Sequence, residues 1–124
     1  MDGARDKRIL IVEDEPILAI ALQDILEGLG YAVVGPALRV APALALAADG
    51  DIDGAILDVN MGEAHSYGIA AVLAARGIPY LFATGYGREG LEAGHETTPV
   101  LPKPYREKQV AVAVAQLFGA PPDS

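Results

Sequence analysis

The fold is decided by the stretch Ile52-Asp53-Gly54-Ala55-Ile56-Leu57-Asp58-Val59-Asn60. Its apolar run, Ala55 to Leu57, is typical of a strand that is buried on both faces of a sheet. The run ends in the carboxylate of Asp58, and a charged side chain is rarely fully buried unless it is paired. We therefore predict that Asp58 lies where the strand leaves the sheet, at the edge where open α/β sheets bind ligands. The structural alternative is an Asp that only caps the following loop.

Short apolar runs alternate with amphipathic segments along the rest of the chain. Four further strands are predicted at Arg8–Val12, Tyr31–Gly35, Ile78–Ala83 and Val100–Leu101. Helices are predicted at about 14–28, 40–49, 66–75 and 106–118, with a short or frayed helix within the glycine-rich segment 85–98. This alternation predicts an α/β domain, in which a mostly parallel five-stranded sheet is covered by helices on both faces.

Three local signals set the expected boundaries of the early elements. Asp14 as N-cap, an acidic first turn and Pro16 indicate the start of the first helix. The apolar stripe expected on that helix consists of Leu18, Leu22, Ile25 and Leu29. The pair Gly35-Pro36 is expected to stop the second strand, and a loop is expected through Gly62.

Length and charge restrict the class of protein. The 124 residues suffice for one domain, with its core at about residues 8–119, and no output domain is expected. Nine Lys and Arg against seventeen Asp and Glu give a net charge of −8, which argues against direct contact with nucleic acid. Cysteine is absent, which excludes disulfides and thiolate metal sites. No signal peptide or membrane-spanning run is recognised, so a cytoplasmic location is expected.

Polar side chains follow four of the five predicted strands, at the edge that parallel strands share. They are Glu13 and Asp14 after the first, Asp58 and Asn60 after the third, Thr84 after the fourth and Lys103 after the fifth. If the first and third strands are neighbours, Glu13, Asp14 and Asp58 converge at the point where the strand order reverses.

This set of side chains suits phosphoryl transfer. Crowded carboxylates repel one another, and a hard cation such as Mg²⁺ (or Mn²⁺) relieves that repulsion through oxygen ligands. Asp58 can then act as a nucleophile and form an acyl phosphate. Lys103 supplies a positive charge and Thr84 a hydroxyl for the phosphoryl oxygens, and both are expected at a polar rim.

Each of these residues also has a plain structural alternative. Glu13 and Asp14 can cap a helix, Thr84 can be an ordinary strand-end hydroxyl, and Lys103 can be a solvated charge beside a turn. Their occurrence in order, each at a strand end, favours the functional interpretation.

The chain resembles response-regulator receiver domains of two-component signalling over nearly its whole length. The motifs that carry the resemblance are Ile11-Val12-Glu13-Asp14-Glu15-Pro16, Ile56-Leu57-Asp58-Val59-Asn60-Met61, Ala83-Thr84-Gly85 and Leu101-Pro102-Lys103-Pro104-Tyr105. The resemblance implies a single-domain, flavodoxin-like, doubly wound sheet of order 2-1-3-4-5. It also implies a phosphoacceptor that is not a turnover enzyme and is a monomer, with a histidine kinase and an unknown downstream protein as partners.

Roles for individual residues follow from the same resemblance. Asp58 is implied as the phosphoacceptor, with Glu13, Asp14 and the backbone carbonyl of Asn60 at the metal. Thr84 and Lys103 are implied as the pair that contacts the phosphoryl group. A cis peptide bond between Lys103 and Pro104 is implied as well.

The segment Phe82-Ala83-Thr84-Gly85-Tyr86-Gly87 is similar to the "FAT GUY" subgroup of receivers, which is associated with kinases of the HWE and HisKA2 type. Receivers usually carry an aromatic switch residue three positions before the lysine, where this chain has Val100. We therefore expect Gly85, Tyr86 and Val100 to mark the switch, and the segment 85–98 to gain order on phosphorylation.

Two other functions compete with signalling. A metal-dependent phosphatase with an aspartyl-phosphate intermediate would need a second Asp two residues after Asp58, where this chain has Asn60. A flavin-binding module would be repelled by the acidic loop after the first strand. His65 and His95 are interpreted as surface residues, and Tyr105 as core packing.

Overall fold

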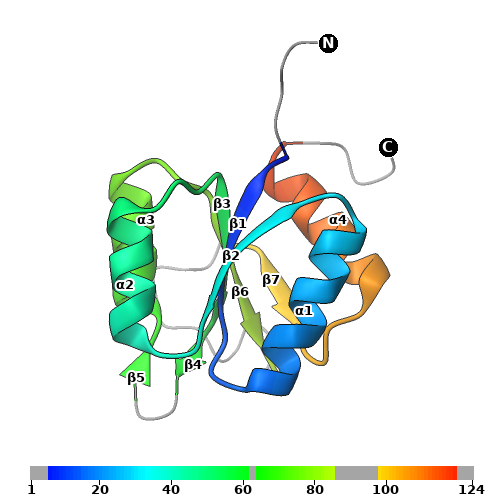
Figure 1. Cartoon of the computed structure of the whole chain (residues 1–124), viewed down its shortest axis with the longest axis horizontal. Coiled ribbons are helices and arrows are strands. Elements are labelled where there is room, and N and C mark those ends of the chain that lie inside the picture. Colours follow the sequence, from blue (N-terminus) through cyan, green and yellow to red (C-terminus); the bar gives the residue numbers. More distant parts are fainter. Residues whose placement is uncertain (1–5, 62–63, 86–97, 120–124) are drawn as a thin grey trace.

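A computed structural model describes residues 6–61, 64–85 and 98–119. Five parallel strands form its sheet, in the order β2-β1-β3-β6-β7 (Figure 1). The strands are β1 (Arg8–Val12), β2 (Ala32–Ala37), β3 (Gly54–Asp58), β6 (Tyr80–Thr84) and β7 (Val100–Pro102). Counted along the chain this is the order 2-1-3-4-5, which confirms the predicted doubly wound fold.

Helices cover both faces of the sheet (Figure 1). The helices α1 (Pro16–Gly28) and α4 (Glu107–Leu117) lie on one face, and α2 (Val40–Asp49) and α3 (Tyr67–Ala75) lie on the other. In the part of the chain that the structure describes, no helix is both long and apolar enough to span a membrane.

The strands are apolar on both faces because each face has its own core. In β3, Ile56 packs with the α1/α4 cluster, whereas Ala55 and Leu57 pack with the α2/α3 cluster. The alternation follows from side chains pointing to opposite faces of a strand. The run Ala55–Leu57 is therefore buried on both sides, as its composition predicts.

The first helix begins later than its acidic signal indicates. Glu15, which has an extended backbone, is the N-cap and makes no side-chain cap bond, and Pro16 opens the helix. Asp14 is therefore not the N-cap, and the prediction is wrong. The buried positions are Ala19, Leu22 and Leu26, so the stripe is rotated toward Leu26, and the other predicted stripe residues are only half-buried.

The second strand continues through Gly35-Pro36, which was expected to stop it. Gly35 has φ 91°, and the register with β1 shifts between Leu10 and Val12, which marks a bulge. A proline is tolerated here because β2 is an edge strand. Beyond the bulge, the Glu13 amide donates to the Ala37 carbonyl at 3.1 Å.

A small hairpin replaces part of the loop expected after β3. The strands β4 (Asn60–Met61) and β5 (Ala64–His65) pair antiparallel. A sequence pattern of two residues per strand is too short to predict such a pair. The peptide bond Lys103–Pro104 is cis, as the resemblance implied, and Gly35–Pro36 is also cis. The helix expected within 85–98 and His95 lie outside the described residues.

Candidate functional site

The site lies at the carboxyl edge of the sheet, where β1 and β3 are neighbours and the chain crosses between the two halves of the fold. A cavity of about 630 Å³ opens there. It is lined by Asp14, Glu15, Leu18, Asp58, Asn60, Thr84, Gly85, Lys103 and Pro104.

Asp58 ends β3 and is 2% exposed. Its Oδ1 accepts from the Lys103 ammonium at 2.9 Å and from the Asn60 amide at 3.3 Å. Its Oδ2 is buried and has no hydrogen-bond partner among the described residues. Burial, and after it the carboxylate of Glu13, raise the pKa of Asp58 to about 8, although Lys103 acts in the opposite direction.

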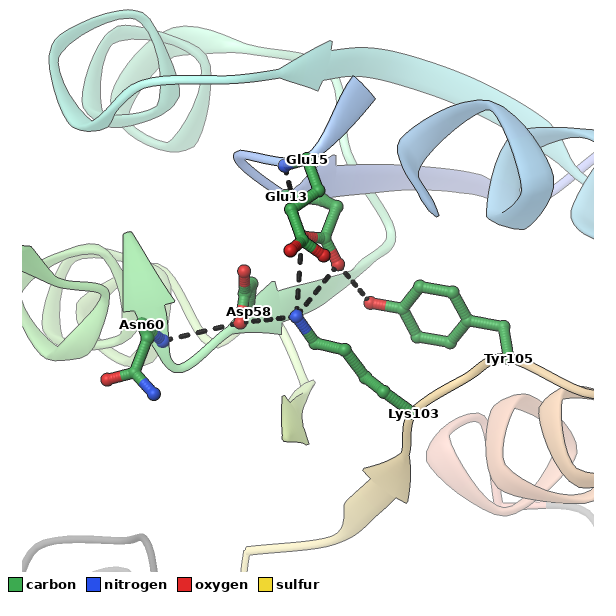
Figure 2. A network of polar contacts seen from close by, with 6 residues as sticks. All are labelled: Glu13, Glu15, Asp58, Asn60, Lys103 and Tyr105. Atoms are coloured by element: carbon green, nitrogen blue, oxygen red, sulfur yellow. Dashed lines mark hydrogen bonds and ion pairs between the residues drawn. The ribbon is translucent and has the colours of Figure 1, made fainter. Parts of the chain in front are cut away.

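Glu13 follows β1 and is fully buried. Its Oε1 accepts from the Tyr105 hydroxyl at 2.7 Å and lies 3.2 Å from the Lys103 ammonium. Its Oε2 accepts from the same ammonium and from the Glu15 amide, both at 3.3 Å (Figure 2). A buried carboxylate needs such partners, because an uncompensated charge in the interior is strongly unfavourable.

Lys103 connects the two buried acids. Its ammonium contacts both Asp58 and Glu13, and its side chain is 16% exposed (Figure 2). Burial lowers the pKa of Lys103, but the hydrogen bond and charge of Asp58, followed by Glu13, outweigh burial and raise it. The expectation of a polar rim is wrong for both residues. Thr84 is the last residue of β6 and is 3% exposed, and Lys103 extends inward to pair with buried carboxylates.

Tyr105 has a second role beyond the predicted core packing. Its ring does pack against the α1/α4 cluster, but its hydroxyl also donates to Glu13. Burial and the nearby carboxylates, Glu13 foremost, raise the pKa of Tyr105, so the hydroxyl keeps its proton as a donor. The available signal was a tyrosine two positions beyond a strand-end lysine, since a buried tyrosine hydroxyl usually finds a partner.

The acids fit a divalent cation. Glu13, Asp14 and Asp58 each offer an oxygen, and these oxygens lie within 4.8 Å of one another. The unpartnered Oδ2 of Asp58 is a buried oxygen with unused ligand capacity. Carboxylate oxygens are ligands that a hard cation such as Mg²⁺ prefers, and Asn60 lies in the same cavity wall.

Of the site residues predicted from the sequence, seven lie together at the carboxyl edge of the sheet, and Val100 lies apart from them. Those brought together are Glu13, Asp14, Asp58, Asn60, Thr84, Gly85 and Lys103. Val100 pairs with Phe82 in the sheet and lines a different groove, between β7 and α4. Tyr86 and the side chain of His65 lie outside the described part of the chain.

A five-stranded parallel sheet of order 2-1-3-4-5 with an acidic cavity at its switch point defines a flavodoxin-like α/β domain. Within that class, residues 9–115 match the response regulator receiver domain family, and the chain belongs to this family. Receiver domains take a phosphoryl group from histidine kinases in two-component signalling, and they are typically phosphoacceptors rather than turnover enzymes.

Several known proteins are similar to this chain. The chain is 33% identical over 114 residues to the phyllosphere-induced regulator PhyR of Methylorubrum extorquens, across 87% of this chain and 42% of PhyR. It therefore spans less than half the length of that relative. The solution structure of SdrG from Sphingomonas melonis Fr1 is 46% identical, with a TM-score of 0.82 over 93% of this chain and 98% of SdrG. The BeF3-activated conformation of SdrG, from Pseudomonas melonis Fr1, matches over the same shares at 46% identity with a TM-score of 0.79.

Proposed function

We propose that this receiver domain accepts a phosphoryl group on Asp58 from a histidine kinase, in a reaction that needs Mg²⁺ or Mn²⁺. The observation that carries the proposal is the asymmetry of the Asp58 carboxylate. Lys103 and the Asn60 amide hold Oδ1, while Oδ2 has no hydrogen-bond partner among the described residues. One oxygen is thus anchored, and the other is available for attack.

The transfer step uses groups that the site already holds. Oδ2 of Asp58 attacks the phosphorus of a phosphohistidine, an O–P bond forms, the N–P bond breaks, and the imidazole leaves with its electron pair. Lys103, now 2.9 Å from Oδ1, is close enough to pair with the phosphoryl oxygens. Thr84 lines the same cavity and would contribute its hydroxyl.

A cation would be held by Asp14, Asp58 and the Asn60 carbonyl, with Glu13 beside it. When bound, it supplies positive charge that offsets the repulsion between the carboxylates and the phosphoryl oxygens. The residues themselves fix the geometry, because Asp58 ends a central strand and the backbone of Glu13, directly after β1, is hydrogen-bonded to Ala37 at the end of β2.

The partner kinase is proposed to be of the HWE or HisKA2 type. The segment Phe82–Gly87, with its resemblance to the "FAT GUY" subgroup, supports this assignment. Gly85 at the cavity and Val100 on β7 would then mark the switch. The phosphorylated domain signals by binding a further protein, or passes on or drains the phosphoryl group.

Phosphotransfer from a purified histidine kinase tests the function. Labelled phosphate should move to the wild type in Mg²⁺, and not after the metal is removed with a chelator. Asp58→Asn should take up none, whereas the matched change Asp49→Asn, on the exposed end of α2, should behave as wild type. Labelling of Asp58→Asn at the wild-type level would show that another residue is the acceptor.

A further inference from the structure

We infer that Tyr105 is a positioning residue, whose hydroxyl holds Glu13 so that Lys103 is free to leave it for the phosphoryl group. The inference rests on the proposed function, and it assigns a role to a side chain beyond the set of acids, hydroxyl and lysine described above.

The geometry places two donors from one short segment on one carboxylate. Lys103 and Tyr105, separated by Pro104, both reach Glu13 from the loop that follows β7 (Figure 2). The hydroxyl makes the shorter contact, at 2.7 Å against 3.2 and 3.3 Å for the ammonium. The shortest hydrogen bond to Glu13 therefore comes from a neutral donor, and it does not depend on Lys103.

Lys103 has to divide its ammonium between two carboxylates. It lies 2.9 Å from Asp58 and 3.2 Å from the nearer oxygen of Glu13. A phosphoryl group on Asp58 adds oxygens that attract the ammonium and draw it away from Glu13. Because Glu13 is 0% exposed, water does not readily replace the lost partner.

Tyr105 supplies the replacement in advance. Its ring is packed against the α1/α4 cluster, so the hydroxyl is held in place whatever Lys103 does. The backbone of Glu13 is fixed in turn, because its amide donates a hydrogen bond to the Ala37 carbonyl. Without the hydroxyl, Glu13 would retain Lys103 more strongly, and the phosphoryl group would lose its positive partner.

The test is the affinity for beryllofluoride, a phosphoryl mimic, at saturating Mg²⁺, followed by NMR together with the signal of the Lys103 ammonium. Tyr105→Phe keeps the ring and removes the donor, and it should weaken binding about 10-fold or more, the usual effect of an outer-shell donor at such sites. The Lys103 signal should shift less on binding than in the wild type. Tyr31→Phe is the matched control, because Tyr31 packs against the same cluster, precedes the amino end of β2, and should leave the affinity unchanged.

A double-variant cycle separates positioning from a general structural effect. In a Glu13→Gln background the neutral amide no longer retains Lys103, so adding Tyr105→Phe should have little further effect. An unchanged affinity in Tyr105→Phe, or an equal loss in both backgrounds, would overturn the inference while leaving the proposed function intact. A wild type that binds no beryllofluoride in Mg²⁺ would instead overturn the proposed function, and the inference with it.

Discussion

The two oxygens of Asp58 lie in different surroundings within one buried carboxylate. Oδ1 is held by Lys103, while Oδ2 has no hydrogen-bond partner among the described residues. Burial and Glu13 keep the group protonated to a higher pH than a free Asp. A proton and a metal cation therefore compete for Asp58. Without metal the raised pKa favours the proton, and a bound cation would displace it.

In metal-free buffer, Asp58 should make the stability of the protein fall as the pH rises from about 4 to about 8. The folded state holds the proton up to a pKa of about 8, whereas the unfolded state loses it near 3.8. Between these values the folded state binds more protons, so the contribution is complete below pH 4 and lost above pH 8. The difference in the free energy of unfolding between wild type and Asp58→Asn, measured in urea over this pH range, gives the contribution of Asp58. A wild-type advantage that grows with pH would contradict it.

Lys103→Ala should destabilise the metal-free protein, in contrast to the small effect of a rim residue. The substitution removes the ammonium that contacts both Glu13 and Asp58, which are buried. Leaving a buried acceptor without its partner costs about 1–3 kcal/mol. Lys108→Ala, an exposed lysine on α4, is the control and should change the free energy of unfolding by less than about 0.5 kcal/mol. Urea denaturation measures both, and equal effects of the two variants would place Lys103 outside the buried pair.

At the scale of elements, the bulge at Gly35-Pro36 brings β2 into the site. It lets Ala37 accept the amide hydrogen bond of Glu13, the acid that Lys103 and Tyr105 hold. A side chain at Gly35 would place its Cβ 2.7 Å from the Ala37 nitrogen, at a φ of 91° that favours glycine. The edge of the sheet thus contributes to the placement of one of the three clustered acids.

Gly35→Ala should therefore destabilise the fold by about 2 kcal/mol or more, since the left-handed backbone alone costs an L-residue roughly 1–2 kcal/mol. It should also weaken Mg²⁺ binding, because Ala37 and Glu13 move together. Gly28→Ala is the control, as a Cβ at Gly28 meets nothing within 4 Å. Urea unfolding and a Mg²⁺ titration of both variants are the measurements, and an unperturbed Gly35→Ala would show that the bulge does not constrain the site.

The sequence predicts those elements whose pattern is long enough and local. The run Ala55–Leu57 shows burial on both faces directly, and the helix at 40–49 agrees with the structure residue for residue. The hairpin at 60–65 and the course of β2 through Gly35-Pro36 depend on tertiary neighbours. The contact between Tyr105 and Glu13 joins residues 92 positions apart. Local periodicity predicts helices and strands, but it does not predict which distant residues come into contact.

At the scale of the whole molecule, the strand order brings the acids together before any ligand is present. Crossing from β2 to β3 places the carboxyl ends of β1 and β3 side by side, with Lys103 reaching in from the other half of the sheet. This explains why strand-end residues read in order from the sequence predict most of the site. The crowding favours a proton on Asp58, and a bound cation can take the place of that proton.

Mg²⁺ should accordingly raise the melting temperature of the wild type. Binding to the folded state alone adds RT ln(1 + [L]/Kd), which is about 2.7 kcal/mol at 100 times Kd. Asp14→Asn removes one of the clustered acids and should lose most of this stabilisation, whereas Asp49→Asn should retain it. Thermal unfolding with Mg²⁺ and with a chelator measures the difference, and an equal gain in both variants would place the metal elsewhere.

The loop after β7 reaches across β6 and β3 to an acid at the end of β1. The last strand of the chain is thus fastened to the first by side chains, over two strands that lie between them. When the Lys103 ammonium moves away from Glu13, one of these two contacts is lost. The hydrogen bond from the Tyr105 hydroxyl to Glu13 then remains. We therefore expect phosphorylation of Asp58 to change the free energy of local opening of β7 and α4, at the opposite edge of the sheet from β2.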